Sequence, residues 1–199
     1  MRKNISFFIL IGAILSIIVF ELSCSGKEDN NVDIIIGPDI DNNNKPNITG
    51  IVASTEKDGV VMTYCLLNTK GDTTLTFSEG EEIIFDLQIE NTTEQPIYFP
   101  DGPSFLGYDT FRIYNDDGID FGVSWTYPPV WTYDMKYLWP STPKHYQCPW
   151  YSDDVIKATF PFIFSPSTIR LICGSYFTGA YCHLKNGTIL SCNLSFNIQ

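Results

Sequence analysis

The sequence predicts an all-β protein folded as an Ig-like antiparallel β-sandwich. Short runs rich in β-branched and aromatic residues recur from about residue 48 onward, and no run shows a helical period. Turn residues such as Gly, Asn and Asp separate these runs about every ten residues. Roughly seven to nine strands of this kind are typical of two antiparallel sheets packed face to face, and an Ig-like arrangement is the commonest way to pack them.

The earliest strong strand signals lie in the first half of the chain. Residues 60–67 form a β-branched and aromatic run that ends in turn residues 68–72, and residues 73–77 form a second run. Residues 83–90 largely alternate between apolar and polar side chains, which predicts a strand with one buried and one solvated face. A short strand is expected at residues 97–99.

Hairpin signals dominate the second half of the chain. Gly118 ends one predicted turn, and Asn186-Gly187 forms another. The strands expected around these turns cover residues 110–114, 119–125, 168–173, 175–184 and 188–198. On the last of them, period-two spacing places four side chains on one face: Cys192, Leu194, Phe196 and Ile198.

Residues 121–151 interrupt this pattern. They contain ten aromatic residues, including all four tryptophans of the chain. Prolines break up the segment and disfavour any regular strand or helix, at Pro128, Pro129, Pro140, Pro143 and Pro149. We therefore expect a long, stiff, aromatic and proline-rich insertion that leaves the sandwich.

Two interpretations of this insertion stay open. The rings can fill the open side of the sandwich as a minor core, or some of them can bind a ligand. Tyr and Trp suit binding because they offer a wide apolar surface with a polar edge, and long structured loops often carry function. The candidate ligand-binding residues lie between the proline breaks: Trp131, Tyr133, Tyr137 and Trp139.

The N-terminus has the order of a secretory signal. Two basic residues precede a largely apolar run at residues 5–20, and Ser23 and Cys24 follow it. A small residue directly before a cysteine resembles a bacterial lipoprotein signal, in which that thiol is acylated. The resemblance implies lipidation of Cys24, although Glu21 stands where such signals usually have an aliphatic residue.

An uncleaved membrane anchor and an unmodified Cys24 thiol are the competing interpretations. The apolar run of 16 residues is shorter than a spanning helix, which needs roughly 20. The chain divides into a signal peptide at 1–23, a flexible polar linker at 24–47 and a sandwich domain at 48–199. Residues 27–29 resemble an acidic tag for the outer membrane, so we expect a lipid-anchored protein exposed on the bacterial cell surface.

The acidic net charge of the chain limits the kinds of partner that it is expected to bind. The chain carries 12 Lys and Arg residues against 23 Asp and Glu residues, a net charge of −11. This balance repels nucleic acid and disfavours electrostatic attachment to anionic lipid. Acyl chains on Cys24 would still hold the protein, because their burial contributes about 0.8 kcal/mol per CH₂. The expected partners are membrane lipid, through Cys24, and a glycan or protein ligand.

Five cysteines remain once Cys24 is assigned to lipid. Thiols outside the inner membrane tend to be oxidised, and an odd number leaves one thiol unpaired. The disulfide candidates are Cys65, Cys148, Cys173, Cys182 and Cys192. A bridge within residues 173–192 is expected first, because three of the five lie close together there. With His183, these three match no zinc spacing, so we expect no metal and no cofactor.

No residue set reaches a catalytic signature, so we expect no enzyme activity. The two histidines, His145 and His183, have no nucleophile motif such as G-x-S-x-G near them. Cys148 follows His145 closely, but a structural cysteine is the preferred interpretation. The aspartates around Gly118 offer oxygen ligands for Ca²⁺, although an ordinary hairpin turn explains them more simply.

Residues 68–91 combine a Gly-containing turn, a Gly-Glu turn and an alternating strand that ends at Asn91. This module resembles one in small bacterial surface lipoproteins and, more distantly, the BsuPI-like proteinase-inhibitor domain. The expected function is non-catalytic binding of a glycan or protein by a membrane-anchored surface lipoprotein. The resemblance implies a proteinase inhibitor as one alternative, with residues 139–149 as its exposed loop. A purely structural protein of the cell envelope is the other alternative.

Overall fold

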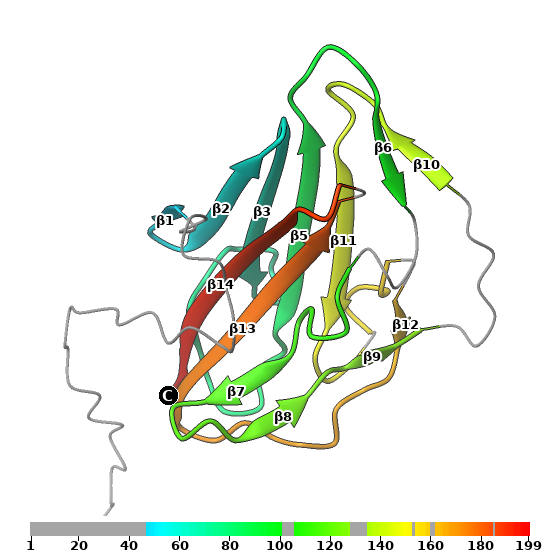
Figure 1. The fold of residues 1–199 in the computed structure, drawn as a ribbon. Helices are drawn as coiled ribbons and strands as arrows, with labels where there is room; N and C mark the ends of the chain where they lie inside the picture. Colours follow the sequence, from blue (N-terminus) through cyan, green and yellow to red (C-terminus); the bar gives the residue numbers. More distant parts are fainter. Residues whose placement is uncertain (1–46, 101–105, 128–134, 153, 160–161, 185) are drawn as a thin grey trace, which may run out of the picture.

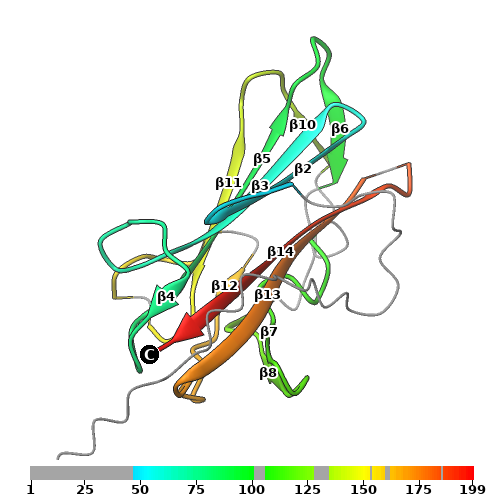
Figure 2. The ribbon, with the colours of Figure 1, turned by 90° about the vertical axis from the view of Figure 1, so that its left-hand side faces the viewer.

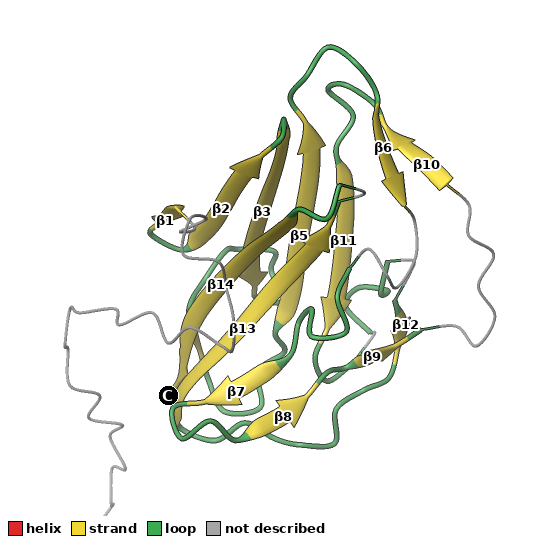
Figure 3. Cartoon of the chain, viewed as in Figure 1, coloured by secondary structure: helices red, strands yellow, loops and turns green. Residues whose placement is uncertain are grey.

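A computed structural model describes residues 47–100, 106–127, 135–152, 154–159, 162–184 and 186–199 (Figure 1). All regular elements in these ranges are β-strands, which confirms the predicted all-β class (Figure 3). A helix long and apolar enough to cross a membrane is not found among these residues.

Most of the strands belong to two five-stranded sheets. The first sheet has the order β1-β2-β3-β5-β11, and each neighbouring pair is antiparallel. Its strands are β1 (Asn47–Thr49), β2 (Val52–Lys57), β3 (Val60–Leu67), β5 (Ile84–Asn91) and β11 (Lys144–Pro149). The second sheet has the order β4-β14-β13-β7-β8, in which β4 alone runs parallel to its neighbour. Its strands are β4 (Thr76–Phe77), β7 (Ile113–Asn115), β8 (Asp120–Gly122), β13 (Gly174–His183) and β14 (Ile189–Ile198).

Two antiparallel ribbons complete the described elements. One pairs β6 (Ile97–Pro100) with β10 (Met135–Leu138), and the other pairs β9 (Trp125–Thr126) with β12 (Ile163–Phe164). In Figure 1 the β6–β10 ribbon lies to the right of the upper ends of β5 and β11.

The two sheets share one core, an arrangement compatible with a β-sandwich. The hydroxyls of Tyr64 on β3 and Thr178 on β13 are hydrogen-bonded at 2.9 Å, and Cys192 Sγ on β14 lies 3.6 Å from the carbonyl oxygen of Met62. β13 and β14 lie along one side of the first sheet in both Figure 1 and Figure 2. Period-two alternation on β3 supplies much of the inner face, with Val60, Met62, Tyr64 and Leu66 fully buried.

Phe111 lies at the centre of this core with an unusual backbone. Its φ is 66°, a left-handed conformation that bulky residues rarely adopt. The fully buried ring stacks on Tyr64 and Phe85, with centroids 5.8 and 5.1 Å away. Its backbone N–H donates to the carbonyl of Gly179 at 2.7 Å. The left-handed residue therefore turns the ring inward while its backbone stays attached to β13.

The alternating strands agree with the sequence predictions. β3 covers residues 60–67 as expected, and β5 is displaced by one residue from the predicted strand at 83–90. β7 and β8 form the predicted hairpin in shortened form, with Gly118 at a φ of 76° in its turn. The predicted inner face of the last strand is confirmed, because four side chains are at most 3% exposed: Cys192, Leu194, Phe196 and Ile198.

The strand predicted at residues 168–173 is wrong. Ile169 and Ile172 are 43% and 67% exposed, so the apolar run does not line a buried face. The backbone N–H groups of Ile169, Leu171 and Cys173 donate to side-chain oxygens instead of to a neighbouring strand. Composition alone therefore suggested a strand that finds no partner.

The expected insertion is also wrong for residues 144–149. These residues form β11, which pairs with β5 along its whole length and closes one edge of the first sheet. Pro149 is tolerated because it ends an edge strand, where a missing N–H breaks no central ladder. Residues 144–149 therefore belong to the first sheet and not to an insertion.

Candidate ligand-binding face

The aromatic segment divides into a buried part and an exposed part. Trp125, Tyr146 and Trp150 are at most 5% exposed and belong to the main core. Tyr137 and Trp139 are instead 52% and 57% exposed. The buried rings therefore fill the core, which is the first of the two interpretations of the segment. The exposed rings are accessible to a ligand, as the second interpretation requires.

The β6–β10 ribbon positions the exposed rings. Tyr137 pairs with Tyr98 in its register, and Leu138 pairs with Ile97. Because successive side chains on a strand point to opposite faces, Leu138 is buried while Tyr98, Tyr137 and Trp139 share the other face. The centroid of the Tyr137 ring lies 5.9 Å from the centroid of the Tyr98 ring and 6.0 Å from that of the Trp139 ring. We call these three residues the aromatic face.

Asn91 fixes the ribbon to the end of β5. Its side-chain Nδ2 donates to the carbonyls of Gln95 at 2.7 Å and Leu138 at 2.8 Å. Its Oδ1 accepts from the backbone N–H of Thr93 at 2.8 Å and from the Thr93 hydroxyl at 2.7 Å. The side chain is 1% exposed, and these four bonds satisfy its buried polar atoms. Asn91 therefore sets where β10 presents its rings.

Two of the four predicted ligand-binding residues, Tyr137 and Trp139, lie together on the aromatic face. Trp131 and Tyr133 lie outside the described residues. Tyr98 is a member that the sequence did not single out, because it belongs to a short strand far away in the chain. The sequence predicts a strand at residues 97–99, but it does not indicate the strand that pairs with it.

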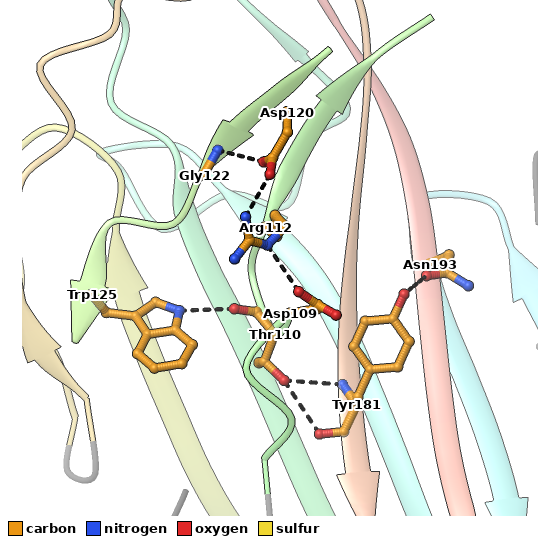
Figure 4. Close-up of polar contacts among 8 residues, drawn as sticks. All are labelled: Asp109, Thr110, Arg112, Asp120, Gly122, Trp125, Tyr181 and Asn193. Carbon is orange, nitrogen blue, oxygen red and sulfur yellow. Dashed lines mark hydrogen bonds and ion pairs between the residues drawn. The ribbon is translucent and has the colours of Figure 1, made fainter. Parts of the chain in front are cut away.

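A second polar network lies beside β13 and does not form a charged binding site (Figure 4). Arg112 pairs with Asp109 through Nε at 2.9 Å and with Asp120 through Nη1 at 2.6 Å. Asp120 also accepts from the backbone N–H of Gly122 at 2.7 Å. Two carboxylates already pair with this guanidinium. Its positive charge is therefore compensated within the protein, and the group is poorly suited to an anionic ligand.

Thr110 connects the same region to β13. Its hydroxyl lies 3.3 Å from both the backbone nitrogen and the carbonyl oxygen of Tyr181, where it replaces a strand partner (Figure 4). Trp125 Nε1 donates to the Thr110 carbonyl at 2.8 Å. The Tyr181 hydroxyl donates to Asn193 Oδ1 at 3.3 Å. These bonds hold the segment before β7 against the sheet, which is a structural role.

The side chains with possible catalytic chemistry are not arranged as a nucleophile in contact with its base. Asp86 Oδ2 is 2.6 Å from His145 Nε2 and accepts from Gln147 Nε2 at 2.5 Å, while Cys65 Sγ lies 4.0 Å from Asp86 Oδ1. A thiol nucleophile must contact the imidazole, whereas here the carboxylate lies between them. Burial and then the Asp86 charge raise the pKa of Cys65 to about 11, which keeps the thiol protonated.

Cys148 is a structural cysteine. It is fully buried, and its spacing from His145 places the two side chains on opposite faces of β11. Its Sγ lies 3.6 Å from Ser124 Oγ, and burial raises the pKa of the thiol to about 12. It therefore takes no part in an acid–base pair with His145.

The disulfide expected first does not form, because Cys182 and Cys192 are free thiols. In the β13–β14 register, Cys182 pairs with Leu190 and Cys192 pairs with Ala180, so the two cysteines are diagonal neighbours. Diagonal positions are about 7–8 Å apart between Cα atoms, beyond the roughly 4.4–6.8 Å that a disulfide spans. Two further disulfide candidates are free thiols as well: Cys65 and Cys148.

The metal interpretations find no support in the described part of the chain, which contains no group of three His, Cys, Asp or Glu residues placed to hold an ion. Asn115 Oδ1 accepts from the backbone N–H groups of Asp117 and Ile119, as in an ordinary hairpin turn. Cys182 faces the core, while the next residue, His183, points to the other face of β13.

Comparisons with known proteins add no relative: no family model, no curated protein and no solved structure matches the chain.

Proposed function

We propose that this protein is a surface lipoprotein whose Ig-like β-sandwich binds a glycan or a protein ligand without catalysis. The observation that supports the proposal best is the aromatic face, on which Tyr137 and Trp139 are 52% and 57% exposed. Large rings left in water forgo the burial that stabilises most aromatic side chains, and such rings are common at binding sites. Asn91 holds the backbone beneath them, so little ordering is needed on binding.

Anchoring through acylated Cys24 is part of the same proposal. Residues 1–23 would be removed as the signal peptide, and residues 24–47 would tether the domain at 48–199 to the outer membrane. We expect the full chain to incorporate labelled palmitate in a bacterial host, and the Cys24→Ser variant to incorporate none. Label retained by Cys24→Ser, or an unmodified amino terminus by mass spectrometry, would contradict the anchor.

The inhibitor alternative gains no support from residues 139–149. From Lys144 onward these residues are strand β11, in which Tyr146, Cys148 and Pro149 are buried. An inhibitor offers an exposed, rigid loop to the protease, and this strand is paired with β5 instead. Binding through the aromatic face is therefore the function that we favour.

Binding should depend on the exposed rings and not on exposed aromatics elsewhere. On a glycan array and a parallel array of purified secreted proteins, we expect the full chain to bind at least one probe. Trp139→Ala and Tyr137→Ala should each weaken that binding about tenfold or more, as central aromatic contacts do. Tyr108→Ala is the matched control, because Tyr108 is 70% exposed but lies outside the ribbon.

The control separates a local site from a general loss of structure. All three variants alter exposed side chains, so their melting temperatures should stay within a few degrees of wild type. Equal losses in Tyr108→Ala and Trp139→Ala would contradict a site on the ribbon. Binding of no glycan and no protein by the wild type would contradict the proposed function itself.

A further inference from the structure

We infer that the aromatic face takes a short, uncharged oligosaccharide and not a protein partner. This inference rests on the proposed function and names the ligand class for that site. It draws on the size of the exposed surface, the spacing of the rings and the absence of charge on the three residues.

The two exposed rings by themselves offer too little area for a stable protein interface. A Tyr or Trp side chain can bury about 150–250 Å², so two rings that are roughly half exposed offer about 200 Å². A specific protein interface needs about 800 Å² from each partner. The β6–β10 ribbon pairs only four residues on each strand, and its other face turns toward the core through Leu138. A ligand the size of a few sugar units matches this area.

The two exposed rings suit stacking against sugars. The centroid of Tyr137 lies 6.0 Å from that of Trp139, whereas Tyr98, whose hydroxyl is buried, packs edge-on against Tyr137 at 5.9 Å and supports it. The ring planes are inclined at 86° and 53° to that of Tyr137, so successive faces point in different directions. Sugar units joined by glycosidic bonds also turn relative to one another, and each presents a C–H face to a ring and hydroxyls to polar edges.

Charge excludes the acidic members of the same ligand class. The aromatic face consists of three uncharged residues, and the whole chain has a net charge of −11. A carboxylate or sulfate held against these rings would lose water without gaining a charged partner, which is costly. The negative field of the protein would oppose its approach as well. Neutral sugars incur neither penalty.

Two hydroxyl-bearing residues follow Trp139 closely in the chain and would supply polar contacts to a bound sugar. The Thr142 backbone N–H donates to the Trp139 carbonyl at 3.3 Å, which makes a turn after β10. Ser141 and Thr142 are both exposed on this turn. A few hydroxyl groups beside an aromatic surface are a common combination in small-molecule sites.

Titration calorimetry on the full chain tests the inference, in a detergent without a sugar headgroup. The probes are neutral gluco-, xylo- and manno-oligosaccharides from disaccharide to hexasaccharide, with oligogalacturonates as the charged counterparts. We expect at least one neutral series to bind, with affinity that stops rising before the hexasaccharide because the face is short. Trp139→Ala should lower that affinity about tenfold or more, and Trp139→Phe should restore part of it. Tyr108→Ala should leave it unchanged.

Each outcome bears on one of the two proposals. Tighter binding of oligogalacturonates, or affinity insensitive to Trp139→Ala, would overturn the uncharged-sugar inference. Binding only to proteins on the arrays, with loss in Tyr137→Ala, would overturn the inference and leave the proposed function standing. Failure of both the sugars and the arrays would overturn both.

Discussion

Replacing Phe111 with alanine is expected to lower the free energy of unfolding by about 3–5 kcal/mol, the cost of removing a large ring from a packed core. The ring is fully buried and lies between Tyr64 and Phe85 in near-parallel stacking, with interplanar angles of 18° and 7°. It also contacts Phe162 at a centroid distance of 5.0 Å. The rings that pack against Phe111 have few rotatable bonds, so we expect much of the cavity to persist. Urea denaturation of the two proteins measures the difference.

The backbone at Phe111 provides an internal check on this prediction. A left-handed conformation costs a residue with a Cβ about 1–2 kcal/mol, whereas glycine adopts it freely. With φ at 66°, Phe111→Gly should therefore be about 1 kcal/mol more stable than Phe111→Ala, although glycine usually weakens strands. An alanine variant more stable than the glycine variant would contradict the left-handed geometry.

Glu82→Ala is expected to cost about 2–4 kcal/mol, because it leaves buried backbone donors without their acceptor. Glu82 is 8% exposed, and its Oε1 accepts from the backbone N–H groups of Trp150 at 2.9 Å and Tyr151 at 2.6 Å. Glu81→Ala is the matched control, since it removes a partly exposed carboxylate that accepts a hydrogen bond from the Ser78 backbone N–H. The control should change stability by well under 1 kcal/mol. Equal losses in both variants would contradict the special role of Glu82.

The same carboxylate should give stability a pH dependence of defined sign. Burial raises the pKa of Glu82 above its ordinary value of 4.5, despite backbone hydrogen bonds that lower it. A carboxyl with a raised pKa favours the folded state when protonated, so its contribution is full below about pH 4.5 and falls as pH rises through the folded-state pKa. The stability of wild type relative to Glu82→Gln should therefore decline as the pH rises above about 4.5. A difference that grows with pH would contradict this assignment.

The fold was predictable wherever one face of a strand is buried and the other is solvated. Residues 60–67 form a β-branched and aromatic run and residues 83–90 alternate, and β3 and β5 lie within one residue of these predicted strands. The strand predicted at 168–173 fails because its β-branched residues are not buried, as the exposed Ile172 shows. Composition indicates an extended chain, whereas pairing depends on partners that a local pattern does not contain.

The prolines concealed strand β11, which forms one edge of the first sheet. The prolines in residues 121–151 argued against regular structure, yet β11 ends at Pro149 on an edge, where the chain needs no further N–H. Two of the four predicted ligand-binding residues, Tyr137 and Trp139, are exposed side by side, and their role in binding stays a prediction. The roles of Tyr98 and Asn91 could not be predicted from the sequence. They depend on a strand register and on hydrogen bonds that connect distant segments of the chain.

The diagonal placement of two thiols makes the β13–β14 hairpin sensitive to the timing of oxidation. A slip of two residues would keep every inward side chain on the inner face, since the period of a strand is two. It would also bring Cys182 directly opposite Cys192, where the native register puts Leu190 opposite Cys182. A bond formed at that moment would hold the hairpin out of register until reduction or thiol–disulfide exchange broke it. Correct assembly therefore requires that this hairpin, set by its Gly187 turn, find its register before an oxidant reaches the two sulfurs.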